Sequence, residues 1–262
     1  MELGLAGRRA VVTGASKGIG FAIAAELIGE GASVAICSRN ATEIANAKAA
    51  MVKDARGRVF AHVCDVTKPS EVEEFVSAAA DHLGGGIDIL VNNAGGAHPG
   101  RFTTLTDEAW HHDYDVKLMS HVRCIRAALP YLRRSPAARI ININAVFGRC
   151  PDSIFLATSA NRAACLALSK ALSADLGQEG ILVNSVNMGY IDTPQWIDGH
   201  RRWNPDRPIE EFFAELVNEE VALGRFGRVD EVSGLVAFLA SDRASYITGA
   251  SIDIAGGMGK YL

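Results

Sequence analysis

A glycine-rich stretch near the start of the chain could hold the phosphates of a nucleotide. It reads TGASKGIG over residues 13–20 and directly follows a short apolar run. Gly14, Gly18 and Gly20 would let the backbone turn tightly and approach a pyrophosphate. A helix beginning there would point its free N–H groups and the positive end of its dipole at that anion. On its own, such a loop can also be an ordinary turn between a strand and a helix.

The elements that must position this loop follow from the hydrophobic pattern. Short β-branched apolar runs predict strands at Arg8–Thr13, Ser33–Ser38, Val59–Val66, Ile87–Asn92, Arg139–Ala145, Ile181–Met188 and Ser251–Ile254. Apolar residues at i, i+3 and i+4 predict helices that include Phe21–Glu30, Glu71–Leu83 and Thr158–Leu176. Strands this apolar are covered on both faces, so we expect an α/β fold with a Rossmann-type, doubly wound parallel sheet of about seven strands.

Composition limits the class of protein. The chain has 262 residues, of which 48% are hydrophobic, and we expect a single domain over residues 1–262. A net charge of −4 does not favour nucleic acid or an acidic membrane as a partner. Five scattered cysteines favour a reducing compartment over a disulfide framework, and no metal-ligand spacing is found, so no metal is expected. The first predicted strand begins at Arg8, which leaves no room for a signal peptide, and no apolar run approaches membrane length. A cytoplasmic protein is therefore expected.

Several motifs in a fixed order resemble the classical short-chain dehydrogenase/reductase family. The glycine spacing is joined by NNAG at residues 92–95, after the fourth predicted strand. Further matches are CDV at 64–66, Asn184 within VNSV, and GYIDTP at 189–194, where the usual preceding proline is Met188. The resemblance extends from about residue 5 to residue 257, which is essentially the whole chain.

This resemblance implies a bound nicotinamide dinucleotide and assigns residues to it. The adenine ring would contact Asp65 and Val66, and the nicotinamide carboxamide would contact Ile191 and Thr193. The residues expected to bind the cofactor are Gly14, Ser16, Lys17, Ile19, Gly20, Arg39, Asp65, Val66, Asn93, Ala94, Gly95, Arg162, Ile191 and Thr193.

The end of the second predicted strand indicates which dinucleotide is used. It carries Ser38 and Arg39 and lacks the acidic residue that would accept hydrogen bonds from a ribose 2′-hydroxyl. Arginine can instead form a forked contact with a 2′-phosphate, and Lys17 adds a second positive charge nearby. We therefore expect NADP(H), the alternative being two solvated surface cations.

The catalytic residues that the resemblance implies are absent. Where the family has asparagine, serine, tyrosine and lysine, this sequence has Lys117, Ala145, Thr158 and Arg162. A threonine is too weak an acid to replace a tyrosine, whose ordinary pKa is about 10. An arginine keeps its charge and does not release a proton near neutral pH. The family's alcohol–ketone chemistry therefore lacks its usual proton donor.

Lys117 is a gained cation at one of these positions. It is either a solvated helix lysine or, with Arg162, part of a cationic floor that polarises a carbonyl or holds a carboxylate. The residues expected to serve catalysis are Lys117, Thr158 and Arg162. Other candidate donors, each more often structural, are Asn144, Ser153, Ser159, His98 and Tyr190, and His111 and His112 are expected on the outer face of a helix.

Residues 192–222 look like an inserted lid over the substrate. They contain the aromatic residues Trp196, Trp203, Phe212 and Phe213, interspersed with Arg201, Arg202 and Arg207. This mixture suits a ligand that is apolar at one end and anionic at the other, such as an acyl thioester or an aromatic acid. The alternative is a helical segment whose aromatic side chains simply pack on the core.

The favoured function is that of an atypical NADP(H)-dependent oxidoreductase, which transfers hydride to a carbonyl or an activated C=C bond. A catalytically silent NADP(H)-binding protein and a non-redox lyase or isomerase are the alternatives, and fold alone does not choose between them. The expected partner is a small-molecule substrate, with no nucleic acid and no membrane. The family's usual homotetramer, built on the two helices beside the active site and the C-terminal segment, is also expected.

Overall fold

The sheet of this protein confirms the predicted α/β class. The computed structural model describes residues 2–53, 55–96, 98–203 and 205–259. Within these ranges, seven parallel strands lie in the order β3-β2-β1-β4-β5-β6-β7. The strands are β1 (Arg9–Thr13), β2 (Ser33–Ser38), β3 (Val59–Val63), β4 (Ile89–Asn92), β5 (Arg139–Ala145), β6 (Leu182–Met188) and β7 (Ser251–Ile254).

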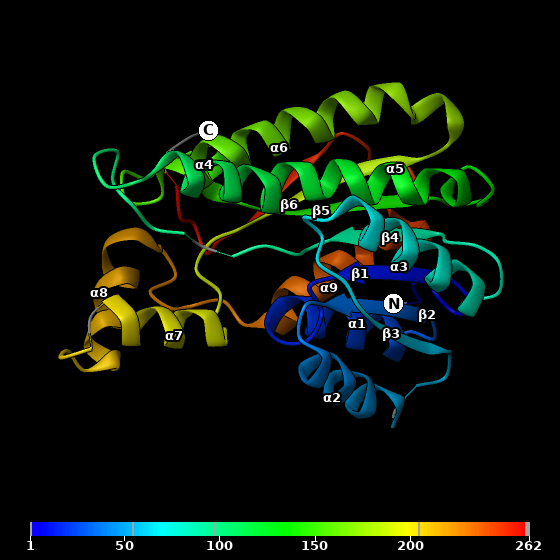
Figure 1. Ribbon diagram of the computed structural model, residues 1–262, viewed down its shortest axis with the longest axis horizontal. Coiled ribbons are helices and arrows are strands. Elements are labelled where there is room, and N and C mark those ends of the chain that lie inside the picture. The colour runs from blue at the N-terminus through cyan, green and yellow to red at the C-terminus, as the bar shows by residue number, and fades with distance from the viewer. Residues whose placement is uncertain (1, 54, 97, 204, 260–262) are drawn as a thin grey trace.

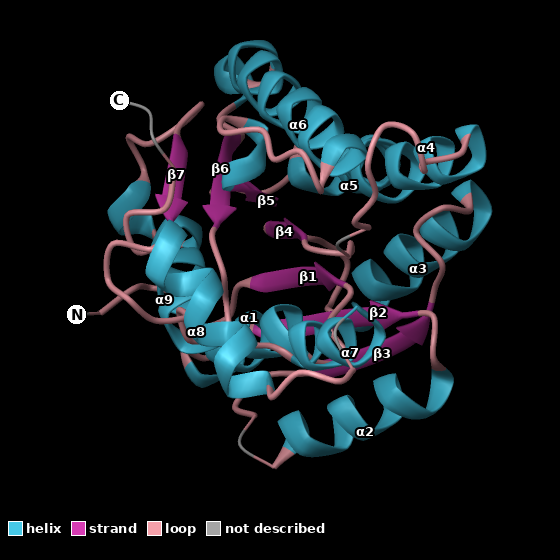
Figure 2. Ribbon diagram, turned by 90° about the vertical axis from the view of Figure 1, so that its left-hand side faces the viewer, coloured by secondary structure: helices cyan, strands magenta, loops and turns pink. Residues whose placement is uncertain are grey.

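Helices cover both faces of the sheet, as Figures 1 and 2 show. They are α1 (Gly18–Gly29), α2 (Ala41–Val52), α3 (Pro69–His82), α4 (Asp107–Tyr114), α5 (Ser120–Leu132), α6 (Leu156–Asp175), α7 (Pro194–Trp203), α8 (Ile209–Glu220) and α9 (Val229–Ala240). Alternate strand residues enter opposite cores, because successive side chains point to opposite faces. Val12 packs with α1, α2 and α9, whereas Val11 packs with α3 and α5.

The chain reverses its direction of travel across the sheet between β1 and β4. From β1 it passes to β2 and β3 on one side, and from β4 it continues to β5, β6 and β7 on the other. A crevice forms at such a switch point, outside the carboxyl ends of the strands. The glycine-rich loop after β1 and the NNAG segment after β4 therefore meet there.

The predicted third strand is too long. Residues 64–66 were expected to continue it, but its partner β2 ends at Ser38, which is paired with Val63. One further backbone hydrogen bond joins Cys64 N to the Ser38 carbonyl, and the chain then leaves the sheet. Asp65 and Val66 consequently face the crevice rather than the sheet edge.

A π-helical turn joins α4 to α5. It spans Asp115–Met119, so the chain from α4 through α5 is one long helix with a local widening. Lys117 lies in this turn and is completely buried. Single π-helical turns within α-helices are frequent at functional sites.

The predicted lid contains α7 and α8, which lie together at the left of Figure 1. Phe213 of α8 packs against Phe226, with ring centroids 4.8 Å apart. None of the helices in the described ranges combines the length and apolarity that crossing a bilayer requires.

Candidate active site

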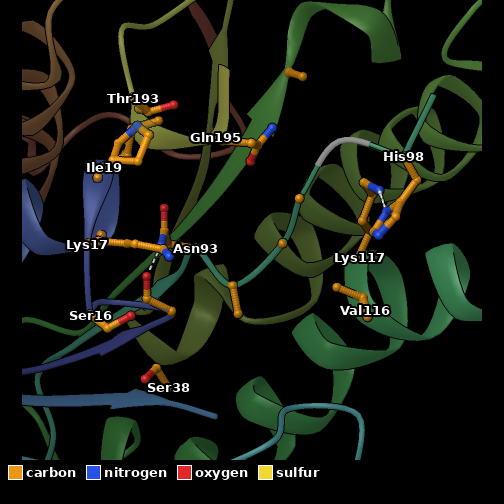
Figure 3. A pocket seen from close by; sticks show the side chains of 18 of the residues that line it. Ser16, Lys17, Ile19, Ser38, Asn93, His98, Val116, Lys117, Thr193 and Gln195 are labelled. Carbon is orange, nitrogen blue, oxygen red and sulfur yellow. Dashed lines mark hydrogen bonds between the residues drawn. The ribbon is translucent and has the colours of Figure 1, made fainter. Parts of the chain in front are cut away.

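A cleft of about 770 Å³ follows the carboxyl ends of the central strands. All of the predicted cofactor-binding residues line it, as do Lys117, Thr158 and Ala145. Figure 3 shows its two sides, with Ser16 and Lys17 on one wall and His98 and Lys117 on the opposite wall. The sequence-based predictions thus fall on one continuous surface.

The glycine-rich loop is fastened to the segment after β4. The Thr13 hydroxyl oxygen accepts hydrogen bonds from the backbone N–H groups of Asn93 and Ala94, both at 3.0 Å. The Asn93 side-chain amide donates to the carbonyls of Thr13 at 2.9 Å and Gly14 at 3.0 Å. Gly14 has a φ of 65°, and a Cβ there would lie 2.7 Å from the Cα of Ala94. This position therefore requires glycine.

The start of α1 is prepared for an anion. Its N-cap residue, Lys17, makes no side-chain capping hydrogen bond, so the first N–H groups of the helix are left for a ligand. These groups and the helix dipole favour a phosphate at this point of the cleft. The close backbone approach at Gly14 and the uncapped N-terminus of α1 fit the pyrophosphate of a dinucleotide.

The corner expected to hold a 2′-phosphate contains an acid that the sequence-based prediction missed. Glu43 lies 3.2 Å from the Lys17 ammonium and accepts a hydrogen bond of 3.2 Å from the Ser16 hydroxyl. Lys17 thus already has an acidic neighbour, which makes Arg39 the main candidate for an incoming phosphate. Glu43 lies in the first turn of α2, just after the Asn40 cap, and that position was the available signal.

At the other end of the cleft, the Asp113 carboxylate gathers donors from several elements. Its Oδ1 pairs with the Lys117 ammonium and accepts hydrogen bonds from His98 Nδ1 at 3.2 Å and Thr158 Oγ1 at 3.4 Å. Its Oδ2 accepts from the Asn161 side-chain amide at 2.9 Å. Asp113 and Lys117 are four residues apart on the same face of the helix, and both side chains are 0% exposed.

Burial and neighbouring charges set the protonation of this pair. Burial raises the pKa of Asp113, but the hydrogen bond from His98 and the charge of Lys117 outweigh it and hold the pKa at about 2. Burial and then the charge of Arg162 lower the pKa of Lys117 to about 8, against the opposing effect of Asp113. Both groups are therefore charged at neutral pH, and the surroundings make Lys117 more acidic than an ordinary lysine.

Arg162 supplies the remaining positive charge. Its guanidinium donates from Nη1 to the Ile143 carbonyl at 2.8 Å rather than to a carboxylate. A Cβ at Gly95 would lie 3.3 Å from its Nη2, so the guanidinium lies beside the loop after β4. Its buried Nε has no hydrogen-bond partner among the described residues, which fits a polar ligand group in the cleft.

The structure corrects the expected cationic floor of Lys117 and Arg162. Lys117 is neither solvated nor open to a substrate, because Asp113 neutralises it and it is completely buried. Thr158 is also occupied, since its hydroxyl proton points to Asp113 and is not available to a substrate oxygen. Arg162 is the cation that remains available.

His112 is an exposed residue of α4, as expected, but the exposed face that carries it borders the cleft. This side chain is exposed but lines the cleft, and its ring meets the ring of His98 edge-on with centroids 5.3 Å apart. The packing of α4 beside the cleft brings it there.

Tyr190 is poorly suited to act as an acid. Burial raises the pKa of its hydroxyl, and its ring packs against Trp196 and Phe226.

The two helices of the predicted lid have different roles: α7 borders the cleft, and α8 packs on neighbouring aromatic residues. Trp196 and Arg202 of α7 line the cleft, as a substrate cover requires. Phe212 and Phe213 of α8 instead pack against His200 and Phe226. Arg201 pairs with Asp198, Arg207 pairs with Glu215, and the side chain of Trp203 lies outside the described residues.

Known proteins resemble this chain over nearly its whole length. A family model for enoyl-(acyl carrier protein) reductase matches residues 14–259. The 3-oxoacyl-(acyl-carrier-protein) reductase of Staphylococcus epidermidis is 31% identical, over 96% of this chain and 98% of that protein. L-Sorbose reductase from Gluconobacter frateurii, solved with NADPH and L-sorbose, has a TM-score of 0.96 and 30% identity over 100% of both chains. An NADPH-bound short chain oxidoreductase from Pseudomonas aeruginosa, reported to contain an atypical catalytic center, has a TM-score of 0.89 and 34% identity over 97% of both chains.

The buried pair can be tested by a double-mutant cycle in urea denaturation. Asp113→Asn leaves Lys117 and Arg162 buried without a counter-charge, so we expect a loss of about 3–5 kcal/mol in the free energy of unfolding near pH 7. Lys117→Met should cost less, because His98, Thr158 and Asn161 still donate to Asp113. The double variant should lose less than the sum of the two single losses.

The pH dependence of this loss has a definite sign. Without Asp113, Lys117 gives up its proton in the folded state below the pKa of about 8 that it has in the native protein. The unfolded chain then binds more protons, so stability rises with pH. The deficit of Asp113→Asn should shrink between about pH 6 and about pH 8. Additive single losses and a deficit that does not depend on pH would contradict the coupled buried pair.

Proposed function

Because the chain belongs to the classical short-chain dehydrogenase/reductase family, we propose that it reduces a carbonyl or an activated C=C bond with NADPH, through a site that works without the family's tyrosine. The observation that carries this proposal is the Asp113–Lys117 pair, buried at the substrate end of the cleft beside Arg162. An ion pair buried in this way is often less stabilising than apolar residues of similar volume. Functional sites often contain groups that lower the stability of the folded protein in this way.

Three features support NADP(H) as the cofactor. Two solved relatives contain NADPH, β2 ends without an acidic residue, and Arg39 lies at that end of the cleft. The loop at Gly14, the start of α1 and the segment from Asn93 to Gly95 would hold the dinucleotide, with Ile191 and Thr193 at the nicotinamide. When bound, the cofactor supplies the hydride.

The side chains of the cleft would then stabilise the charge that develops on the substrate. Arg162 is positively charged and has an unpartnered Nε, so it can stabilise an oxyanion or hold the nicotinamide ribose. Asp113 and Lys117 position this end of the site and fix Thr158 through its hydroxyl. The aromatic rings of Tyr190 and Trp196 offer apolar surface to the rest of the substrate. The atypical catalytic center of the Pseudomonas aeruginosa relative is consistent with chemistry of this kind.

One observation favours a second candidate, a silent NADP(H)-binding protein. Lys117 and Thr158 both direct their polar atoms to Asp113, so neither offers a proton to a ligand in this arrangement. Turnover decides between the two candidates. A screen of ketones and enones in which NADPH binds but is never oxidised would favour the silent protein.

Arg39 provides the test of cofactor choice. We expect NADPH to bind at least about tenfold more tightly than NADH, since charge-assisted hydrogen bonds to the 2′-phosphate contribute about 1.5–3 kcal/mol. Arg39→Ala should remove most of this preference in calorimetry and leave NADH binding unchanged. Lys17→Ala is the matched control, with a smaller effect because Glu43 already pairs with it. Equal affinities in the native protein would contradict the proposal.

The catalytic roles can be compared through three substitutions in one assay. Arg162→Ala should lower kcat about 10²–10³-fold on the best substrate of the screen, the usual effect of losing an electrostatic stabiliser. Lys117→Ala should lower kcat less, because the buried Lys117 acts only through its pairing with Asp113. Thr158→Val should be mild, because its proton is committed to Asp113. NADPH affinity, measured by nicotinamide fluorescence, separates lost catalysis from lost binding. Turnover unchanged by both cation substitutions would oppose a remodelled site.

We also propose that the chain forms a homotetramer through α5, α6 and the segment that follows β7. This is the arrangement that the family resemblance implies, and the exposed Leu223, whose N–H donates to the Gly256 carbonyl, offers apolar surface beside the segment after β7. Light scattering at micromolar concentration should give the mass of four chains. The mass of a single 27.8 kDa chain would contradict it.

A further inference from the structure

We infer that His98 is the proton donor of this site, oriented by Asp113 in place of the missing tyrosine. The inference rests on the proposed reductase function and names the acid which that function needs. His98 follows the NNAG segment directly in the chain, on the wall of the cleft where the tetrad positions lie. Figure 3 shows its ring beside Lys117.

The geometry of His98 is that of an oriented acid. Nδ1 lies 3.2 Å from the buried Asp113 carboxylate, which fixes the ring and favours a proton on that nitrogen. The side chain is 42% exposed and lines the cleft, so Nε2 is the nitrogen left for a substrate or for water. A histidine held by a carboxylate through Nδ1 and acting through Nε2 is a general arrangement for proton transfer.

The other candidate groups are excluded by their surroundings. The Thr158 hydroxyl donates a hydrogen bond to Asp113, Lys117 has no exposed surface, and Arg162 does not release a proton near neutral pH. Burial raises the pKa of Tyr190 and so opposes its ionisation. His98 has a partly exposed side chain on the cleft wall and a ring nitrogen that is not held by Asp113.

Several charged or titratable groups face this ring. Asp113 and His112 face it from α4, and Lys117 faces it from the π-helical turn, with Nζ 3.5 Å from Nδ1. The charge of Arg162, on α6, acts on Lys117. Asp198 and Arg202 of α7 line the same cleft. The charges nearest to the ring are therefore the Asp113 carboxylate and the Lys117 ammonium.

The proposed step balances with the nicotinamide cofactor as reductant. The cofactor would supply a hydride to the carbonyl carbon, where a C–H bond would form as the C=O electron pair moves to oxygen. The Nε2–H bond of the imidazolium breaks as an O–H bond forms on the substrate, which leaves a neutral imidazole that still donates from Nδ1 to Asp113. A proton from bulk solvent would then restore the imidazolium at Nε2, and the overall reaction would consume one proton and one hydride.

The first test uses turnover of a ketone found in the screen. We expect His98→Gln to lower kcat about 10²–10³-fold, a typical contribution of a general acid, while KM and NADPH affinity change little. His111→Gln is the matched control, because His111 lies on α4 with its side chain exposed and away from the cleft lining. The native kcat should fall as the pH rises, and this dependence should be lost in His98→Gln.

A second readout needs no turnover. In the protein without cofactor, NMR follows the protonation of the His98 ring through resonances assigned by comparison with His98→Gln. The midpoint should match the fall in kcat, apart from any shift caused by bound cofactor. His121, which is buried with no partner for either ring nitrogen among the described residues, should not change protonation above its pKa of about 3.

The outcomes separate the inference from the proposed function. Full kcat in His98→Gln, a loss that follows His112→Gln instead, or a His98 ring that stays in one protonation state would each overturn the inference and leave the reductase standing. A native protein that binds NADPH and turns over no ketone or enone would overturn the proposed function, and the inference with it.

Discussion

The buried carboxylate of Asp113 is the group on which the substrate end of the cleft depends. α4 supplies it, and the π-helical turn, α6 and the loop after β4 each send a donor to it, namely Lys117, Thr158 and His98. Without this negative charge, Lys117 and Arg162 would be two neighbouring buried cations, whose repulsion is strong where the dielectric constant is low. One anion therefore fixes both the packing of these elements and the direction of their side chains.

The nucleotide end of the cleft could be predicted from the sequence because short segments determine it. The glycine-rich loop and the NNAG segment carry their function in local backbone geometry, and the structure brings both to the switch point of the sheet. The strands Ser33–Ser38 and Arg139–Ala145 were also predicted at their observed bounds. The third strand was predicted too long because its end depends on where its neighbour β2 ends, and the residues of β3 do not show this.

The substrate end could not be predicted in the same way, because its charges are set by tertiary packing. The sequence placed Lys117 in the cleft but not its partner, although Asp113 lies four residues earlier on the same helix. A carboxylate within a helix is usually solvated, and only the packing of α4 against α6 buries this one. The partner of Lys17 was missed for the same reason, since the pairing with Glu43 joins the N-cap of α1 to α2.

The hydrogen bonds between Thr13, Asn93 and Ala94 connect the two ends of the cleft. They fasten the loop after β4 to the phosphate cradle, and His98 is only three residues beyond Gly95 in that same loop. A nucleotide that orders the loop at Gly95 would also restrict the positions of His98. The substrate would then bind with a smaller loss of conformational entropy. Such coupling acts equally in both directions, so a ligand held beside His98 would also strengthen the binding of the dinucleotide.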